Sequence, residues 1–207
     1  LGSPEEIEKL INKNTRAIYF ETITNPQLHI TDIEMLSALA RKHNILLICD
    51  STMTPPNVFE AGNQGVNIEV LSATKYLSGG ATAFGGIIID HGNYDWQLNP
   101  CISKYHAKFG KGAFIARLRK NIYRNTGTSM TPQIAKLMIQ GIDILEIRVQ
   151  RCYENCMALG QFLQTHHKVK KVDYPGLENN PEYPLARKQF RGIPGTILSF
   201  DLESKEA

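Results

Sequence analysis

The sequence lacks the features that mark several common classes of protein. Lys and Arg number 23 against 20 Asp and Glu, and no basic stripe is interleaved with aromatic residues, which argues against nucleic-acid binding. No apolar stretch approaches the length needed to cross a membrane, and the first residues do not combine a cationic start with an apolar run. We therefore expect a cytoplasmic globular protein with no nucleic-acid or membrane partner.

Cysteine is scarce, and its spacing is uninformative about metals. None of the four cysteines belongs to a C-x-x-C pair, and Cys49 lies inside an apolar run. Cys152 and Cys156 share one face of a predicted helix, but no second pair or flanking histidine accompanies them. We expect free thiols in a reducing compartment and no metal site.

The 207 residues do contain a regular alternation of strand and helix patterns. Ser3-Pro4-Glu5-Glu6 is a capping box that predicts a first helix. Thr31-Asp32-Ile33-Glu34 is a second capping box and predicts a helix that ends near His43. Apolar runs predict strands at residues 17–20, 45–49, 68–71 and 86–89. The uninterrupted run 45–49 is typical of a strand covered on both faces. This order predicts an α/β fold with a mainly parallel sheet flanked by helices.

The pattern becomes largely helical after residue 112. One helix is predicted around 114–122, a second from Thr131, and a long one over 144–166; a strand at 169–172, a helix at 185–190 and a strand at 196–200 follow. We expect residues 1–143 to form part of a large domain, 144–166 a bridging helix, and 167–207 the start of a small C-terminal domain. Because a unit with about two strands is seldom stable alone, we expect the chain to be the central segment of a longer protein.

Two charged side chains stand where ligands bind in open α/β sheets. Asp50 directly follows the run 45–49, and Lys75 follows the strand 68–71, beside Ser72 and Thr74 and ahead of paired glycines. The lysine precedes the glycines, so the stretch is not a P-loop. Asp50 could ligate a metal, cap a helix or pair with a cationic ligand. A Schiff-base lysine, hydroxyls for a phosphate and a carboxylate for a pyridinium nitrogen are together what pyridoxal phosphate requires.

These residues also carry a family resemblance. The stretches ETITNPQLHITDIEMLSALARKHNILLICDSTMTPP and SATKYLSGGATAFGG resemble the cysteine and methionine metabolism family of pyridoxal-phosphate enzymes, which have fold type I. Within that family, YDW, KGAFIARLR and YPGLENNPEYPLARKQF are most similar to the O-acetylhomoserine sulfhydrylases. The resemblance covers nearly the whole chain.

The resemblance implies a role for each candidate residue. Lys75 would hold the cofactor covalently and move protons during the reaction, and Asp50 would pair with the pyridine nitrogen. The other cofactor-binding positions would be Ser72 and Thr74 at the phosphate, Asn25 at the phenolic oxygen, and Thr52 beside the cofactor. Ser51 and Gly80 depart from the family pattern, which usually has Asn and often His at these places.

The resemblance further implies a reaction in methionine biosynthesis. Its members join sulfide or a thiol to O-acetyl-L-homoserine by γ-replacement, and we expect a homo-oligomer, a dimer or tetramer, in the complete protein. A first alternative is a γ- or β-elimination lyase or a cystathionine γ-synthase of the same family. A second alternative is a catalytically silent truncated domain. In either case we expect the 207 residues alone to be inactive.

Overall fold

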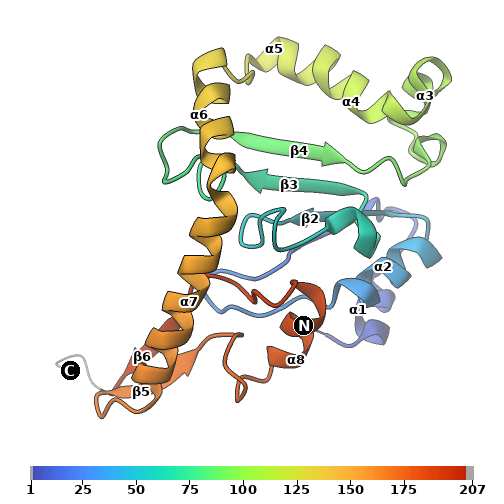
Figure 1. Ribbon diagram of the computed structural model, residues 1–207. Coiled ribbons are helices and arrows are strands. Elements are labelled where there is room, and N and C mark those ends of the chain that lie inside the picture. The colour runs from blue at the N-terminus through green and yellow to red at the C-terminus, as the bar shows by residue number, and fades with distance from the viewer. Residues whose placement is uncertain (1, 204–207) are drawn as a thin grey trace.

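A computed structural model describes residues 2–203 and contains one central sheet with helices on both faces (Figure 1). The strands are β1 (Ala17–Glu21), β2 (Leu46–Asp50), β3 (Ile68–Ser72) and β4 (Gly86–Asp90), in that spatial order. β1, β2 and β3 run parallel, while β4 is antiparallel to β3. The expected α/β fold with a mainly parallel sheet is confirmed, with β4 as the exception because it returns directly from the loop after β3.

Two helices cover one face of the sheet. α1 (Pro4–Leu10) begins with the capping box expected at Ser3, and α2 (Ile33–Lys42) packs on β1 and β2. The expected capping box at Thr31 is wrong. Asp32 is the N-cap and accepts a hydrogen bond from the Met35 amide at 3.0 Å, because the Thr31 hydroxyl is turned away and donates to the Glu21 carbonyl.

The opposite face is covered at one end by the segment that follows β4. This segment contains short 3₁₀ turns at Trp96–Leu98 and Gly110–Gly112, and the helix α3 (Ser103–Phe109). The single helix expected around 114–122 is observed as α4 (Ala113–Arg117), a π-helical stretch over Leu118–Tyr123 and α5 (Arg124–Thr126). Trp96 stacks on Phe114, with ring centroids 5.0 Å apart, and this pair packs the segment onto the sheet.

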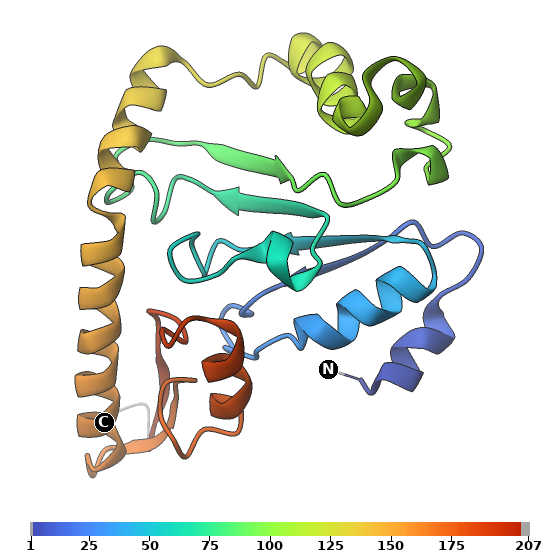
Figure 2. The same ribbon diagram turned by 45° about the vertical axis from the view of Figure 1, so that its right-hand side comes forward.

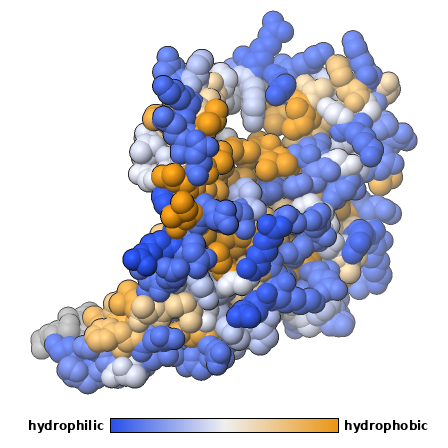
Figure 3. Space-filling model, in the orientation of Figure 1, coloured by the Kyte–Doolittle hydropathy of each residue, from blue (hydrophilic) through white to orange (hydrophobic). Residues whose placement is uncertain are grey.

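α6 (Pro132–Asp143) and α7 (Leu145–Gln164) form a long edge along one side of the sheet (Figures 1 and 2). α6 begins at the predicted Thr131-Pro132 step, where the Thr131 hydroxyl accepts from the Ile134 amide. Apolar side chains are exposed along these helices, including Ile139 at 61% and Ile147 at 73% of their accessible surface. Figure 3 shows apolar surface gathered over this side of the molecule.

The C-terminal unit consists of β5 (Val169–Asp173), α8 (Tyr183–Gln189) and β6 (Ser199–Leu202), with β5 and β6 antiparallel. The last strand therefore begins three residues later than the expected 196–200, because residues 194–197 form a loop that packs against the rest of the chain. α8 is docked on α2. Ala186 and Phe190 are fully buried and belong to the same core as β1, β2 and α2. No helix within residues 2–203 is long and apolar enough to span a membrane.

Candidate active site

The candidate residues gather at the carboxyl ends of the parallel strands. Asp50 is the last residue of β2, Ser72 is the last residue of β3, and Lys75 lies in the loop that follows. Because β2 and β3 run parallel, both ends lie at the same edge of the sheet, the edge that faces α6 and α7 (Figure 1). The topology therefore places these three positions at the same edge of the sheet.

The half-buried carboxylate of Asp50 has one oxygen engaged by the backbone. Its Oδ1 accepts a hydrogen bond from the Thr52 amide at 2.8 Å, and its Oδ2 lies 3.5 Å from the Tyr19 hydroxyl. Burial, and then the negative charge of Asp50, raise the pKa of Tyr19. The residues after Asp50 form turns rather than a helix, so Asp50 is not a helix N-cap. Oδ2 has no close partner beyond Tyr19 among the described residues.

Thr52 joins the ends of the two strands. Its buried hydroxyl oxygen accepts a hydrogen bond from the Ser72 amide at 2.8 Å. This contact ties the loop that carries Asp50 to the end of β3, so the two ends of the site keep a fixed separation. The Ser72 hydroxyl itself has no hydrogen-bond partner within residues 2–203.

Lys75 presents a free amine at this edge. The residue is exposed, and across the described part of the chain its Nζ has neither a hydrogen bond nor an ion pair. Its backbone is held, since the Lys75 amide donates to the Ser72 carbonyl at 3.3 Å. An amine without a structural partner is available for chemistry.

Thr74 closes the loop that contains Lys75. Its Oγ1 accepts a hydrogen bond from the Gly85 amide at 2.9 Å, and its own amide donates to the Gly85 carbonyl at 3.1 Å. The Ser78 hydroxyl donates to the Thr74 carbonyl at 2.6 Å. Thr74 Oγ1 also donates a hydrogen bond to the Gly85 carbonyl oxygen at 3.2 Å. A hydroxyl can rotate, so it can donate to a ligand instead while it still accepts from the Gly85 amide.

Asn25 is the candidate that the structure ties least to the others. It is exposed in the loop after β1, at the same edge of the sheet as Asp50, and its side chain has no hydrogen bond to another described residue. Its expected role at the cofactor remains a prediction.

The residues present fit pyridoxal phosphate in their chemistry. The edge offers a free primary amine at Lys75, a half-buried carboxylate with an available oxygen at Asp50, and an unpartnered hydroxyl at Ser72. These are partners for an aldehyde, a ring nitrogen that carries a proton, and a phosphate. Within residues 2–203, neither the Lys75 amine nor the Asp50 carboxylate forms an ion pair.

The residues that sequence reasoning missed lie behind and beside this edge. The fully buried Ser51 hydroxyl donates to Glu69 Oε1 at 2.5 Å, and Glu69 Oε2 lies 3.1 Å from His91 Nε2. Ser51 is thus engaged with a carboxylate inside the core. A glutamate within the apolar strand pattern of β3 is the signal that could have revealed this network. Tyr19 gave no signal beyond its place in a strand.

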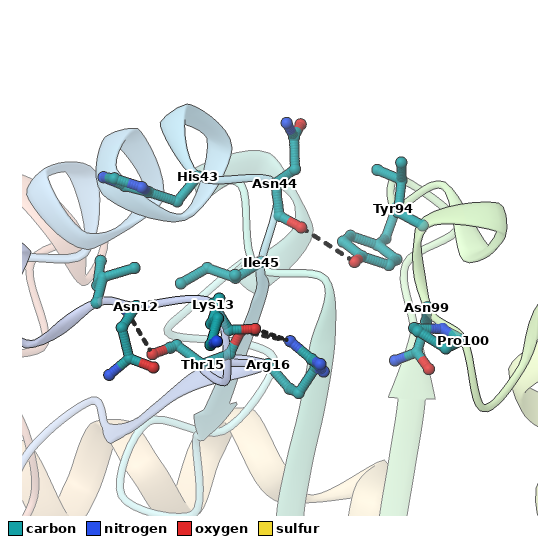
Figure 4. A pocket seen from close by; sticks show the side chains of 12 residues that line it. Asn12, Lys13, Thr15, Arg16, His43, Asn44, Ile45, Tyr94, Asn99 and Pro100 are labelled. Carbon is teal, nitrogen blue, oxygen red and sulfur yellow. Dashed lines mark hydrogen bonds between the residues drawn. The ribbon is translucent and has the colours of Figure 1, made fainter.

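A separate pocket of about 480 Å³ lies at the opposite edge of the sheet (Figure 4). It is lined by residues that precede β1 and β2 and by the loop after β4, where the Tyr94 hydroxyl donates to the Asn44 carbonyl at 3.2 Å. None of the candidate residues lines this pocket. Its place at the amino ends of the strands separates it from the candidate site.

Comparison with known proteins identifies relatives over almost the whole chain. An O-acetyl-L-homoserine sulfhydrylase of Leptospira meyeri is 34% identical over 222 residues, which cover 98% of this chain and 50% of that protein. An L-methionine gamma-lyase of Fusobacterium nucleatum is 36% identical over 200 residues, 96% of this chain and 46% of that protein. The chain therefore spans about half the length of the curated relatives it matches.

Solved structures of similar proteins have the same fold as this chain. An O-acetylhomoserine sulfhydrylase of Wolinella succinogenes superposes with a TM-score of 0.90 at 41% identity, covering 99% of this chain and 57% of that one. A putative O-acetylhomoserine (thiol)-lyase of Campylobacter jejuni superposes with a TM-score of 0.86 at 32% identity over 98% of this chain and 52% of its own, and it contains an N'-pyridoxyl-lysine-5'-monophosphate. These neighbours have the fold-type I architecture of pyridoxal-phosphate enzymes.

The family model for Cys/Met metabolism PLP-dependent enzymes matches residues 1–207. Together with the mostly parallel sheet and the lysine and aspartate at its carboxyl edge, this match shows that the chain belongs to the Cys/Met metabolism family of pyridoxal-phosphate-dependent enzymes.

Proposed function

We propose that the complete protein uses pyridoxal phosphate to replace the acetoxy group on Cγ of O-acetyl-L-homoserine with sulfide or a thiol, so that acetate is released. The observation that carries the proposal is the unpartnered amine of Lys75 at the same strand edge as the Asp50 carboxylate. The similarity to two O-acetylhomoserine sulfhydrylases, from Leptospira meyeri and Wolinella succinogenes, supports the choice of substrate.

The chain's own residues would divide the work by chemistry. When bound, the cofactor supplies an electron sink for the negative charge that develops on the substrate carbon. The Lys75 amine would hold the cofactor and, when released by the substrate amine, would carry protons between substrate carbons. The Asp50 carboxylate would keep a proton on the ring nitrogen through Oδ2, since Oδ1 already accepts from the Thr52 amide.

The remaining positions would bind and orient. The Ser72 and Thr74 hydroxyls would donate to the phosphate; Thr74 can do so while still accepting from the Gly85 amide. Thr52 would act beside the cofactor by fixing the Ser72 backbone, and Asn25 would reach the phenolic oxygen.

The proposal extends to organisation and setting. Residues 1–143 would belong to the large cofactor-binding domain, 144–166 would bridge, and 167–207 would begin the small domain. The exposed apolar side chains of α6 and α7, such as Ile139 and Ile147, favour a homo-oligomer in the complete protein. The complete protein would then be a cytoplasmic enzyme of methionine biosynthesis, in agreement with the proposed substrate.

A lyase of the same family is the alternative that a specific observation favours. The methionine gamma-lyase of Fusobacterium nucleatum is similar to this chain over the same residues, and elimination would use the same lysine and carboxylate. Product analysis of the complete protein with O-acetyl-L-homoserine, with and without sulfide, separates the two. Homocysteine that appears only with sulfide supports replacement, whereas 2-oxobutanoate formed at equal rates without sulfide supports elimination.

The cofactor assignment is tested by borohydride reduction of the complete protein loaded with pyridoxal phosphate, followed by peptide mapping. We expect the pyridoxyl label on Lys75 and its loss in Lys75→Ala, while Lys136→Ala, which removes an exposed lysine of α6, keeps the label. A label on another lysine would refute the assignment. Residues 1–207 alone should show no turnover whichever function the complete protein has, so the silent-domain alternative is tested with the complete protein, where an absence of turnover would support it.

A further inference from the structure

The loop that follows Lys75 is pressed against the junction of α6 and α7 (Figure 1). A Cβ atom at Gly141, near the end of α6, would lie 2.1 Å from the Leu77 carbonyl oxygen and 2.4 Å from the Gly79 amide nitrogen. No side chain fits at such distances. Glycine at position 141 therefore permits a backbone-to-backbone contact between the lysine loop and α6.

Arg148, in the first turn of α7, holds the same loop by a charged hydrogen bond. Its Nη2 donates to the Tyr76 carbonyl at 2.5 Å and to the Gly141 carbonyl at 3.2 Å. In residues 2–203 its guanidinium has no carboxylate partner, and its Nε is buried without a hydrogen bond. The half-buried guanidinium therefore donates to backbone carbonyls. One of these carbonyls lies at the C-terminal end of α6, where the helix dipole makes a positive charge favourable.

A third segment meets the loop at Tyr76. The Tyr76 and Thr196 hydroxyls share a hydrogen bond of 2.5 Å, and Thr196 belongs to the loop before β6. Tyr76 is thus fixed at its carbonyl by α7 and at its hydroxyl by the C-terminal unit. Both contacts act on the residue next to Lys75.

Lys75 needs such a support, because in the described part of the chain its amine has no hydrogen-bond or ion-pair partner. The amine stands at the end of a flexible four-carbon chain, and its reach depends on where the backbone places the Cα atom. On one side the Lys75 amide is bonded to Ser72, and on the other the Tyr76 carbonyl is bonded to Arg148.

We propose that Arg148 is a positioning residue for Lys75. It acts through its hydrogen bond to the Tyr76 carbonyl, in a loop that Gly141 allows to pack directly against α6. The proposal rests on the proposed function in one respect, that Lys75 attaches the cofactor. In this role Arg148 contacts neither the Lys75 side chain nor the cofactor. It fixes the backbone from which the amine extends.

The test compares three variants of the complete protein. Arg148→Met removes the donor and the charge, and Arg148→Lys keeps a cation that can reach a carbonyl. Arg151→Met is the matched control, since Arg151 lies on the same helix, is exposed and, within residues 2–203, has its one side-chain hydrogen bond and ion pair with Glu154. Thermal unfolding of each variant establishes that it is folded.

The first readout is hydrogen exchange of the cofactor-free protein, at the Gly79 amide that donates to the Tyr76 carbonyl at 3.4 Å. We expect about tenfold faster exchange in Arg148→Met, because a charge-assisted hydrogen bond to that carbonyl is lost. We expect an intermediate rate in Arg148→Lys and no change in Arg151→Met.

The second readout separates attachment from binding. We expect Arg148→Met to bind pyridoxal phosphate but to attach it to Lys75, measured by borohydride trapping at fixed occupancy, about tenfold more slowly. Arg148→Lys should recover most of that rate. A general loss of structure would lower binding and attachment together and would not be rescued by lysine.

The proposal is overturned if Arg148→Met exchanges and attaches like Arg151→Met, or if exchange quickens while attachment at equal occupancy is unchanged. If the unsubstituted protein attaches no cofactor at Lys75, the proposed function fails. In that event, unchanged hydrogen exchange in Arg148→Met would show that Arg148 does not hold the loop, whereas faster exchange would show that it does.

Discussion

At the level of single residues, the charge of Asp50 can be removed with little change in the shape of its side chain. Asp50→Asn keeps an oxygen that can accept from the Thr52 amide, so the turn after β2 should persist. The negative charge that would hold the ring proton is lost, and we expect turnover of the complete enzyme to fall by two or more orders of magnitude, about 3 kcal/mol or more of barrier. Steady-state kinetics with O-acetyl-L-homoserine measure this.

Asp32→Asn is the matched control for that substitution. Asp32 also accepts a hydrogen bond from a backbone amide, that of Met35 three residues on at 3.0 Å, but its role is to cap α2. We expect near-normal turnover in this variant, since Asn is as good an N-cap as Asp. Near-normal turnover in Asp50→Asn as well would mean that Asp50 serves only the turn.

The thiols of α7 offer a second test at the residue scale. Burial raises the pKa of Cys156 to about 11, with a smaller contribution from Cys152. Because the thiolate is the reactive form, alkylation of Cys156 by iodoacetamide should be slow at pH 8 and rise about a hundredfold by pH 10. Exposed Cys152 on the same helix is the internal reference. Mass spectrometry of the two peptides checks the ratio, and equal labelling at pH 8 would contradict it.

At the scale of secondary-structure elements, the contact of α6 with the lysine loop depends on Gly141. Gly141→Ala places a methyl group 2.1 Å from the Leu77 carbonyl oxygen, so loop and helix must separate. We expect the free energy of unfolding to fall by about 1–3 kcal/mol, as for other overpacked sites. Chemical denaturation of the complete protein measures the change.

Gly160→Ala in α7 provides the comparison. There the new Cβ would lie 3.4 Å from a Leu177 methyl, an ordinary contact. Alanine also has the higher helix propensity, by about 1 kcal/mol. We therefore expect this variant to be as stable as the parent or more so. Equal losses in both variants would show that the close approach at Gly141 is not the cause.

At the scale of the whole molecule, Gln189 joins the C-terminal unit to α2. Its buried amide accepts from the Ile33 amide and donates to the Thr31 carbonyl, both at 2.9 Å. Gln189→Leu fills the space but leaves both backbone groups without partners, at about 1–3 kcal/mol for each. We expect a clear loss of stability in thermal unfolding, together with faster hydrogen exchange at the start of α2.

The adjacent Lys188 is the control for this prediction. It lies on the same helix and forms an exposed ion pair with Glu34, again between α8 and α2. Exposed pairs contribute little, so Lys188→Met should leave the melting temperature nearly unchanged. If the two variants behaved alike, the docking of α8 would rest on its apolar contacts alone.

Much of this arrangement could be predicted because its causes are local. The apolar run that ends at Cys49 predicts a buried strand, and the next residue, Asp50, must then stand at its carboxyl end. The position of Lys75 after a strand and before paired glycines follows in the same way. The order of strands and helices similarly implies parallel pairing of β1, β2 and β3, which the structure contains.

What the sequence alone determined is therefore most of the strands and helices, the edge of the sheet where the candidate residues lie, and the cofactor class. Only the tertiary structure decided the antiparallel return of β4, the docking of α8 through Gln189, and the support of the lysine loop by Arg148. The physical reason is separation along the chain. Arg148 lies 72 residues from Tyr76, and Gln189 lies 158 from Thr31. Contacts at such separations depend on how complete helices and strands pack against one another. The residue pattern within a single helix or strand therefore does not predict them.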